Sequence, residues 1–332
     1  MGSPGVRFYF AIDMMKFAFV FPGQGSQSVG MMHGWEARAE IRHTFDEASN
    51  ALGEDLWALV SHGPEDVLYQ TVNSQPAMLA ADVAAWRAWR ASCSELPSIM
   101  AGHSLGEYAA LVAADALGFA DAIRLVRFRA EAMQHAVPEG VGAMAAILGM
   151  DDEAVRAVCI EAALGEVVEA VNFNSPGQIV IAGNKAAVER AMVLAKERGA
   201  KRALPLAVSV PSHSSLMLPA AEALKQHLQS VTINPPSIPV LHNMDVASHS
   251  DTDMIRQSLV RQLHMPVRWV ETVHKLKAAG AECLVECGPG KVLTGLCKRI
   301  DNTLPALALI DDEALQEALV ILSAQHSASA LA

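Results

Sequence analysis

The stretch SIMAGHSLGEYAAL, residues 98–111, decides the fold of this chain. The short apolar run from Ser98 to Ala101 predicts a buried strand, and the residues from Glu107 onward are strong helix formers. Between them lies GHSLG (102–106), which has the form G-x-S-x-G. A glycine-flanked serine between a strand and a helix is typical of the nucleophile turn of an α/β enzyme.

The chemistry explains why this order matters. A serine at a sharp strand-to-helix turn is held exposed and strained, and the flanking glycines let the turn close. The helix N-terminus places the N–H of Leu105 beside Ser104, where it would stabilise an oxyanion. The alternative is a turn whose serine only caps the helix. The strand before and the helix after favour a nucleophile.

A serine nucleophile needs a base, and the chain contains 12 histidines. His103 adjoins Ser104, so its ring cannot easily face the same point. His213 lies in LAVSVPSHSSLM, just past a predicted strand, and is the better candidate, although spacing alone does not select it. Arg129 lies in a helix that is apolar around it; the alternative there is a surface arginine whose stem covers apolar side chains.

Two glycine-rich turns raise the question of phosphate binding. The stretch FVFPGQGSQSVGMM (19–32) begins a dinucleotide fingerprint but has Ser28 at the third glycine position. The stretch GPGK (288–291) lacks both the early glycine and the Ser or Thr of a phosphate-binding loop, with Val285 and Val292 in those places. The first turn instead exposes backbone N–H groups at a strand end, where they would meet some other anion.

The composition excludes several classes of protein. At 332 residues, 52% hydrophobic and 18% charged, the chain suits a compact enzyme of one large domain or two. A net charge of −11 argues against nucleic acid as a partner. No run of 18 uncharged apolar residues supports a membrane span. The five cysteines have no zinc-site or disulfide spacing, so we expect buried thiols in a reducing compartment, the cytoplasm.

The pattern of predicted strands and helices changes after residue 140 and divides the chain into two parts. After PEG (138–140), the sequence predicts strand, helix, strand, strand, helix with an Asn cap, and strand, a ferredoxin-like unit. The expected division is therefore 15–140 with 210–322 for the larger part and 141–209 for the inserted one. Residues 1–14 are interpreted as an N-terminal extension or tag, and the chain from 323 is expected to fray.

Eight stretches occur in an order that resembles one family: FVFPGQGSQ, GHSLGEYAAL, RFRAEAMQ, GAMAAILG, NSPGQIVIAG, VSVPSHSSLM, QLHMPVRW and ECGPGKVL. They resemble the malonyl-CoA:acyl carrier protein transacylases of bacterial fatty acid synthesis, over about residues 15–322. The resemblance implies an α/β-hydrolase-like core with the ferredoxin-like insertion. It also implies ping-pong transfer of malonyl from coenzyme A to the phosphopantetheine thiol of an acyl carrier protein, through a seryl ester.

The resemblance assigns roles to eight residues. It implies a nucleophile, a general base, a backbone carbonyl that orients the base, and an arginine for the malonyl carboxylate, at Ser104, His213, Gln262 and Arg129. It further implies two backbone N–H groups for the oxyanion and two amides near the acyl site, at Gln24, Leu105, Asn172 and Asn174. In hydrolases an acid completes the triad; here a carbonyl takes its place, which still fixes the histidine tautomer.

The resemblance implies no metal and no redox cofactor, and a transient, acidic carrier protein as partner of a cytoplasmic monomer. Candidates for a basic docking surface are Lys201, Arg202, Arg268, Lys298 and Arg299. Three alternatives stay open: a discrete acyltransferase that serves a polyketide synthase, a serine esterase or phospholipase, and an inactive module that only docks carriers. Ser212, before the histidine, does not exclude the polyketide role.

Overall fold

The computed structural model describes residues 15–138, 140–207 and 210–329, so the interpretation of residues 1–14 lies outside the described part. The larger of two sheets is parallel, with strand order β7-β2-β1-β8-β9. Its strands are β1 (Phe17–Phe21), β2 (Ile99–Gly102), β7 (Val240–Leu241), β8 (Cys283–Cys287) and β9 (Ala306–Leu309).

Strand β1 lies at the centre of this sheet, and all five of its residues are buried. Its phenylalanines, Phe17, Phe19 and Phe21, pack into one core, and Ala18 and Val20 pack into the core on the other face. A parallel sheet needs cover on both faces, which is why this strand is apolar without alternation.

Helices cover both faces of the parallel sheet. Between β1 and the antiparallel unit the chain forms α1 (Ala39–Leu52), α2 (Leu56–His62), α3 (Glu65–Leu68), α4 (Thr71–Ser92), α5 (Gly106–Ala113) and α6 (Phe119–Ala136). After that unit it forms η1 (Ser215–Met217), α9 (Leu218–His227), η2 (Leu228–Ser230), α10 (Thr252–Gln262), α11 (Trp269–Ala278), α12 (Val292–Ile300) and α13 (Asp312–Ser329). Helices α11 and α12 pack on the face of Ala18 and Val20, whereas α1, α4, α5, α6, α9, α10 and α13 belong to the core of the β1 phenylalanines. No helix in the described ranges is long and apolar enough to cross a membrane.

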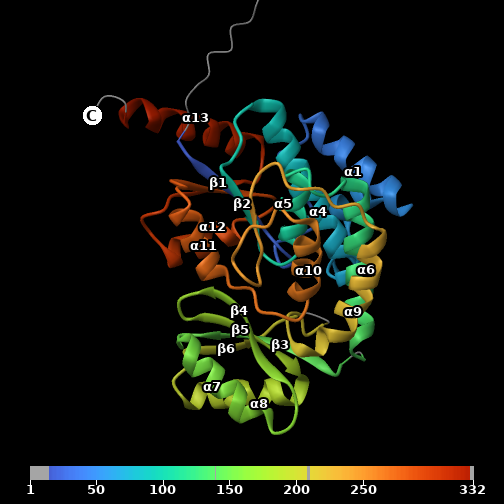
Figure 1. The fold of residues 1–332 in the computed structure, drawn as a ribbon, viewed down its shortest axis with the longest axis vertical. Coiled ribbons are helices and arrows are strands. Elements are labelled where there is room, and N and C mark those ends of the chain that lie inside the picture. The colour runs from blue at the N-terminus through green and yellow to red at the C-terminus, as the bar shows by residue number, and fades with distance from the viewer. Residues whose placement is uncertain (1–14, 139, 208–209, 330–332) are drawn as a thin grey trace, which may run out of the picture.

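The second sheet is antiparallel, with strand order β4-β5-β3-β6. Its elements are β3 (Gly142–Leu148), α7 (Asp152–Ala163), β4 (Val168–Ser175), β5 (Gln178–Asn184), α8 (Lys185–Glu197) and β6 (Arg202–Pro205). Figure 1 shows this unit below the parallel sheet, with α7 and α8 on its outer face. The predicted fold class, an α/β-hydrolase-like core with a ferredoxin-like insertion, is confirmed, whereas the exact boundaries of the division stay a prediction.

Two local expectations differ from the structure. Asn184 is the N-cap residue of α8, as predicted, but its side chain accepts from the Val167 N–H at 2.8 Å and not from an N–H of the helix. The expected fraying from residue 323 is replaced by continuation of α13 to Ser329. The sequence there, SAQHSAS, contains no glycine or proline to stop a helix.

Candidate active site

The nucleophile turn joins β2 to α5 and puts Ser104 in a left-handed conformation, with φ of +51°. The flanking glycines are required by close approach. A Cβ on Gly102 would lie 1.9 Å from the backbone carbon of Gly106, and one on Gly106 would lie 2.1 Å from the carbonyl oxygen of Phe21. The turn therefore presses against β1, as the G-x-S-x-G spacing predicts.

The structure brings His213 to the serine. Its Nε2 lies 2.7 Å from Ser104 Oγ, and its Nδ1 lies 2.7 Å from the backbone carbonyl oxygen of Gln262. The carbonyl accepts the Nδ1 proton, which leaves Nε2 as the acceptor that faces the serine hydroxyl. The predicted arrangement of serine, histidine and carbonyl is thus geometrically in place.

The surroundings keep His213 neutral. Burial, with a smaller contribution from the charge of Arg129, lowers the pKa of His213 to about 3. An imidazole with that pKa is unprotonated at neutral pH, which is the state that a general base needs.

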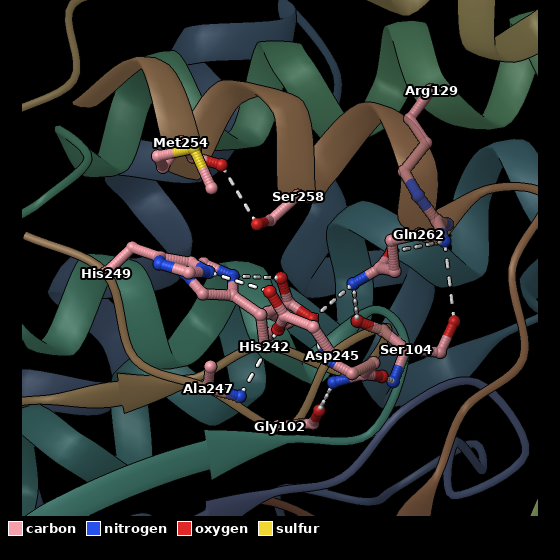
Figure 2. Close-up of polar contacts among 12 residues, drawn as sticks. Gly102, Ser104, Arg129, His242, Asp245, Ala247, His249, Met254, Ser258 and Gln262 are labelled. Atoms are coloured by element: carbon pink, nitrogen blue, oxygen red, sulfur yellow. Dashed lines mark hydrogen bonds and ion pairs between the residues drawn. The ribbon is translucent and has the colours of Figure 1, made fainter. Parts of the chain in front are cut away.

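Arg129, on α6, is buried with 2% of its surface exposed, so the alternative of a surface arginine is wrong. One guanidinium nitrogen donates to Gln75 Oε1 at 2.6 Å. The other lies 3.2 Å from Gln262 Oε1 and 3.4 Å from Ser104 Oγ. Figure 2 shows the side chain directed at Gln262 and Ser104. Within the described residues no carboxylate contacts it, although an ionised group at this depth calls for an anionic partner.

A cavity of about 360 Å³ opens in front of these groups, with Gln24 and Leu105 in its lining. In the described part of the chain, the backbone N–H groups of these two residues have no protein acceptor. Two free donors beside a serine are the arrangement that binds an oxyanion. The glycine-rich turn at 22–25 therefore borders the nucleophile turn, since a Cβ on Gly23 would lie 2.4 Å from the carbonyl oxygen of His103.

The antiparallel unit supplies the opposite wall of the cavity, including Asn172 and Asn174 of β4. Asn174 Oδ1 lies 2.8 Å from Nε2 of His103, so His103 bonds across the cavity and leaves Ser104 to His213. All eight predicted site residues line this cavity or contact its lining. Their catalytic roles stay predictions.

Sequence reasoning missed three buried residues around the site, Gln75, Glu107 and Asn243. Gln75 accepts from Arg129, Asn243 binds the nucleophile turn from behind, and Glu107 accepts from the backbone N–H of Asn243. A signal existed for Glu107, an acid inside the apolar run GEYAALVA, and for Asn243, a polar residue two positions after the strand end at Leu241. Such residues are typical of buried polar networks.

The described residues contain no group of three or more His, Cys, Asp or Glu side chains that could hold a metal ion. Of the five cysteines, Cys159, Cys283, Cys287 and Cys297 are buried, and burial raises the pKa of each thiol. A thiol with a raised pKa is a poor nucleophile, so these four cysteines are poor candidates for a reactive group.

Comparison with known proteins agrees with this geometry. Residues 18–311 match the family described as the acyl transferase domain. The malonyl CoA-acyl carrier protein transacylase of Salmonella typhimurium is 56% identical over 307 residues, 92% of this chain and 99% of that protein. The crystal structure of an acyl-carrier-protein S-malonyltransferase from Burkholderia pseudomallei has a TM-score of 0.90 at 58% identity, covering 92% of this chain and 99% of that one.

A further structure is of a malonyl-transacylase in complex with a holo acyl carrier protein of a type II polyketide synthase. It has a TM-score of 0.91 at 55% identity and covers 92% of this chain and 99% of its own. The chain therefore belongs to the acyl transferase domain family, and within it to the malonyl CoA-acyl carrier protein transacylases.

Proposed function

We propose that this enzyme transfers malonyl from coenzyme A to the phosphopantetheine thiol of an acyl carrier protein in fatty acid synthesis. The reaction is ping-pong, and Ser104 holds the malonyl group as an ester between the two half-reactions. The relatives described above support the activity. The observation that carries the substrate assignment is the buried Arg129, 3.4 Å from the serine oxygen and without a carboxylate partner in the described part of the chain.

In the first half-reaction, His213 Nε2 accepts the proton of Ser104 Oγ as the oxygen attacks the thioester carbonyl carbon. The developing oxyanion accepts from the N–H groups of Gln24 and Leu105. The C–S bond then breaks, and the leaving sulfur of coenzyme A takes the proton from His213. A malonyl ester on Ser104 remains.

The second half-reaction reverses these steps with a different thiol. His213 takes the proton of the phosphopantetheine thiol, and the sulfur attacks the ester carbonyl carbon. The C–O bond breaks and the serine oxygen recovers its proton. The carbonyl of Gln262 holds the ring throughout, because it accepts from Nδ1 at 2.7 Å in place of the usual acid.

Arg129 selects the acyl group. A malonyl thioester carries a free carboxylate that loses water as it enters the cavity, and a planar guanidinium meets both of its oxygens. Asn172 and Asn174 are proposed to contact the acyl chain from the wall formed by β4. Acetyl would leave the guanidinium without an anion, so the same side chain attracts one substrate and rejects the other.

The test is the intact mass of the enzyme after incubation with malonyl-CoA. Wild type should gain one malonyl group, located on Ser104, and Ser104→Ala should gain none. His213→Ala should acylate slower by orders of magnitude, because the pair acts as a unit. Rapid release of free malonate would favour the esterase alternative, and an unmodified wild type would favour a module that only docks carriers.

A polyketide carrier is the second candidate, because one of the similar structures described above is bound to the carrier protein of a type II polyketide synthase. Comparing kcat/KM for a fatty acid carrier and a polyketide carrier would separate the two. We also propose a cytoplasmic monomer without a metal or redox cofactor, and the domain boundaries 15–140 with 210–322 and 141–209. Family membership supports these proposals, and sedimentation would test the oligomeric state.

A further inference from the structure

A buried carboxylate lies directly behind the nucleophile turn. Glu107, on α5, is 0% exposed, and none of the reaction steps uses it. One of its oxygens lies 2.7 Å from Nδ1 of His242. The other accepts from the backbone N–H of Asn243 at 2.9 Å and from Nε2 of Gln262 at 2.8 Å. A carboxylate is tolerated at this depth only with such donors around it, so these three groups are fixed by it in turn.

Asn243 in turn holds the nucleophile turn through two hydrogen bonds. Its Nδ2 donates to the carbonyl oxygen of Gly102 at 2.6 Å, and its Oδ1 accepts from the N–H of Ser104 at 2.7 Å. One carboxamide thereby ties the residue before the turn to the residue at its apex. Ser104 needs such a tie, because its left-handed conformation is strained for a residue other than glycine.

The parallel sheet brings these distant residues together. Strand β7 pairs with β2 in the register Met100↔Val240 and Ala101↔Leu241. Two residues beyond each strand end, the chain therefore reaches Asn243 on one side and the turn on the other. Asn243 is 1% exposed, so water does not compete for its amide.

We infer that Asn243 is a positioning residue for the nucleophile, anchored by Glu107 and acting through the backbone of the turn. This inference rests on the proposed role of Ser104. Because Asn243 occupies the N–H of Ser104, that group is not available to the substrate. The N–H of Leu105 remains free toward the cavity, and Oγ of Ser104 is directed at His213.

The geometry demands a carboxamide. An aspartate would set a second acceptor against the carbonyl oxygen of Gly102, where the donor now lies at 2.6 Å. A leucine would have similar volume but would leave the N–H of Ser104 and the carbonyl of Gly102 without this partner, which destabilises the turn. Either change releases the turn while leaving the side chains of Ser104, His213 and Arg129 unchanged.

The experiment compares Asn243→Asp and Asn243→Leu with Ser258→Ala as the matched control. Ser258 is also buried and also donates to a backbone carbonyl, that of Met254, but it does not contact the turn. The readouts are the rate of serine labelling by a small fluorophosphonate, the kcat and KM for malonyl-CoA, and the unfolding temperature. Labelling needs only the nucleophile, the base and the oxyanion donors.

We expect labelling rate and kcat to fall together by about 10- to 100-fold in both Asn243 variants, since misplacement by about 1 Å costs on that order. KM should change less than about threefold, and Ser258→Ala should label like wild type. Labelling of the Asn243 variants within about twofold of the control would overturn the inference. A wild type that is labelled on Ser104 but takes no malonyl would contradict the proposed function and leave this comparison intact.

Should the Asn243 variants fail to fold, Glu107 provides the second comparison. Glu107→Gln keeps one oxygen for Asn243 and Gln262, and its new NH₂ group faces His242, which accepts by changing tautomer. Glu107→Ala removes every contact. The inference requires that Glu107→Gln label at least about tenfold faster than Glu107→Ala. Equal labelling rates in these two variants would overturn it.

Discussion

At the scale of one residue, the buried guanidinium beside Ser104 carries the substrate prediction. Arg129 has Gln75 and Gln262 as acceptors and the ring of Tyr108 5.5 Å from its guanidinium carbon, and the charge of Glu107 also acts on it. Burial lowers the pKa of Arg129, but a guanidinium remains charged in proteins. Burial raises the pKa of Tyr108 to about 12, so the tyrosine is neutral. We propose that the carboxylate of the malonyl group neutralises the charge of Arg129.

The prediction at this scale concerns Arg129→Ala. Malonyl transfer should lose about 2–5 kcal/mol of transition-state stabilisation, or roughly 30- to 5,000-fold in kcat/KM, because a desolvated carboxylate loses its partner. Acetyl transfer should fall far less. Arg129→Lys should recover only part of the loss, since an ammonium cannot meet both oxygens.

The decisive measurement is kcat/KM for malonyl-CoA and acetyl-CoA with wild type and both variants. Fluorophosphonate labelling of Ser104 serves as the control, because that probe has no carboxylate for Arg129 to bind. If both thioesters lose the same factor in Arg129→Ala, the arginine has a structural role only.

At the scale of elements, α4 contains an acid that the reaction does not use. Asp82 is fully buried, and its carboxyl oxygens have no partner in the described part of the chain. It packs against the turns that follow β8 and β1, since a Cβ on Gly288 would lie 2.1 Å from its Oδ1 and 2.8 Å from Pro22. Burial, with a smaller contribution from Glu286, raises the pKa of Asp82 well above its usual value.

The sign of the effect on stability follows from the protons bound. Between the usual Asp pKa of about 3.9 and the raised pKa, the unfolded chain has released the proton and the folded chain retains it. Unfolding therefore releases a proton, and stability falls as pH rises through this window, by at most about 1.4 kcal/mol per pH unit.

Asp82→Asn should remove this dependence. The difference in free energy of unfolding, variant minus wild type, should increase from pH 5 to pH 8 in urea titrations. Asp66→Asn, at an exposed position of α3, is the matched control and should show a constant difference. A constant difference for Asp82→Asn as well would show that Asp82 ionises equally in both states.

Elements and site differ in how far the sequence predicts them. The strand-turn-helix at 98–111 and the unit at 142–205 can be predicted from local periodicity. The structure confirms the order and type of their elements. Local patterns failed where tertiary contacts compete, as at Asn184, whose amide serves Val167. Glu107 and Asn243 meet only through the register of β2 and β7, more than 130 residues apart, which no local pattern records.

At the scale of the whole molecule, the net charge of −11 must be reconciled with an acidic carrier protein. The structure shows which of the five residues proposed for carrier docking already have an acidic partner. Arg268 is paired with Glu271 through two contacts, so its charge is already compensated. In the described part of the chain the other four, Lys201, Arg202, Lys298 and Arg299, make no ion pair.

Two of those four cations, Arg299 and Lys201, are connected by contacts between α12 and the antiparallel unit, and Lys298 and Arg202 are their neighbours in the sequence. Arg299, on α12, contacts Gln178 at the start of β5. The preceding residue, Gly177, accepts from the N–H of Gly149, and the stem of Lys201 packs over Gly149. A connected row of contacts therefore runs from α12 to the beginning of β6, and we predict that the carrier docks along it.

The prediction is tested on the carrier half-reaction, starting from the malonyl enzyme. The double variant Lys201→Glu with Lys298→Glu should raise the carrier KM on the order of tenfold at low salt, chiefly through slower association. Raising the salt concentration should raise the carrier KM of wild type toward that of the variant, because exposed charges are screened. Lys16→Glu makes the same change at the amino end of β1, opposite the active site, and should behave like wild type. A carrier KM that is independent of salt in wild type, or an equal rise in Lys16→Glu, would mean that the carrier is not held by this row of cations.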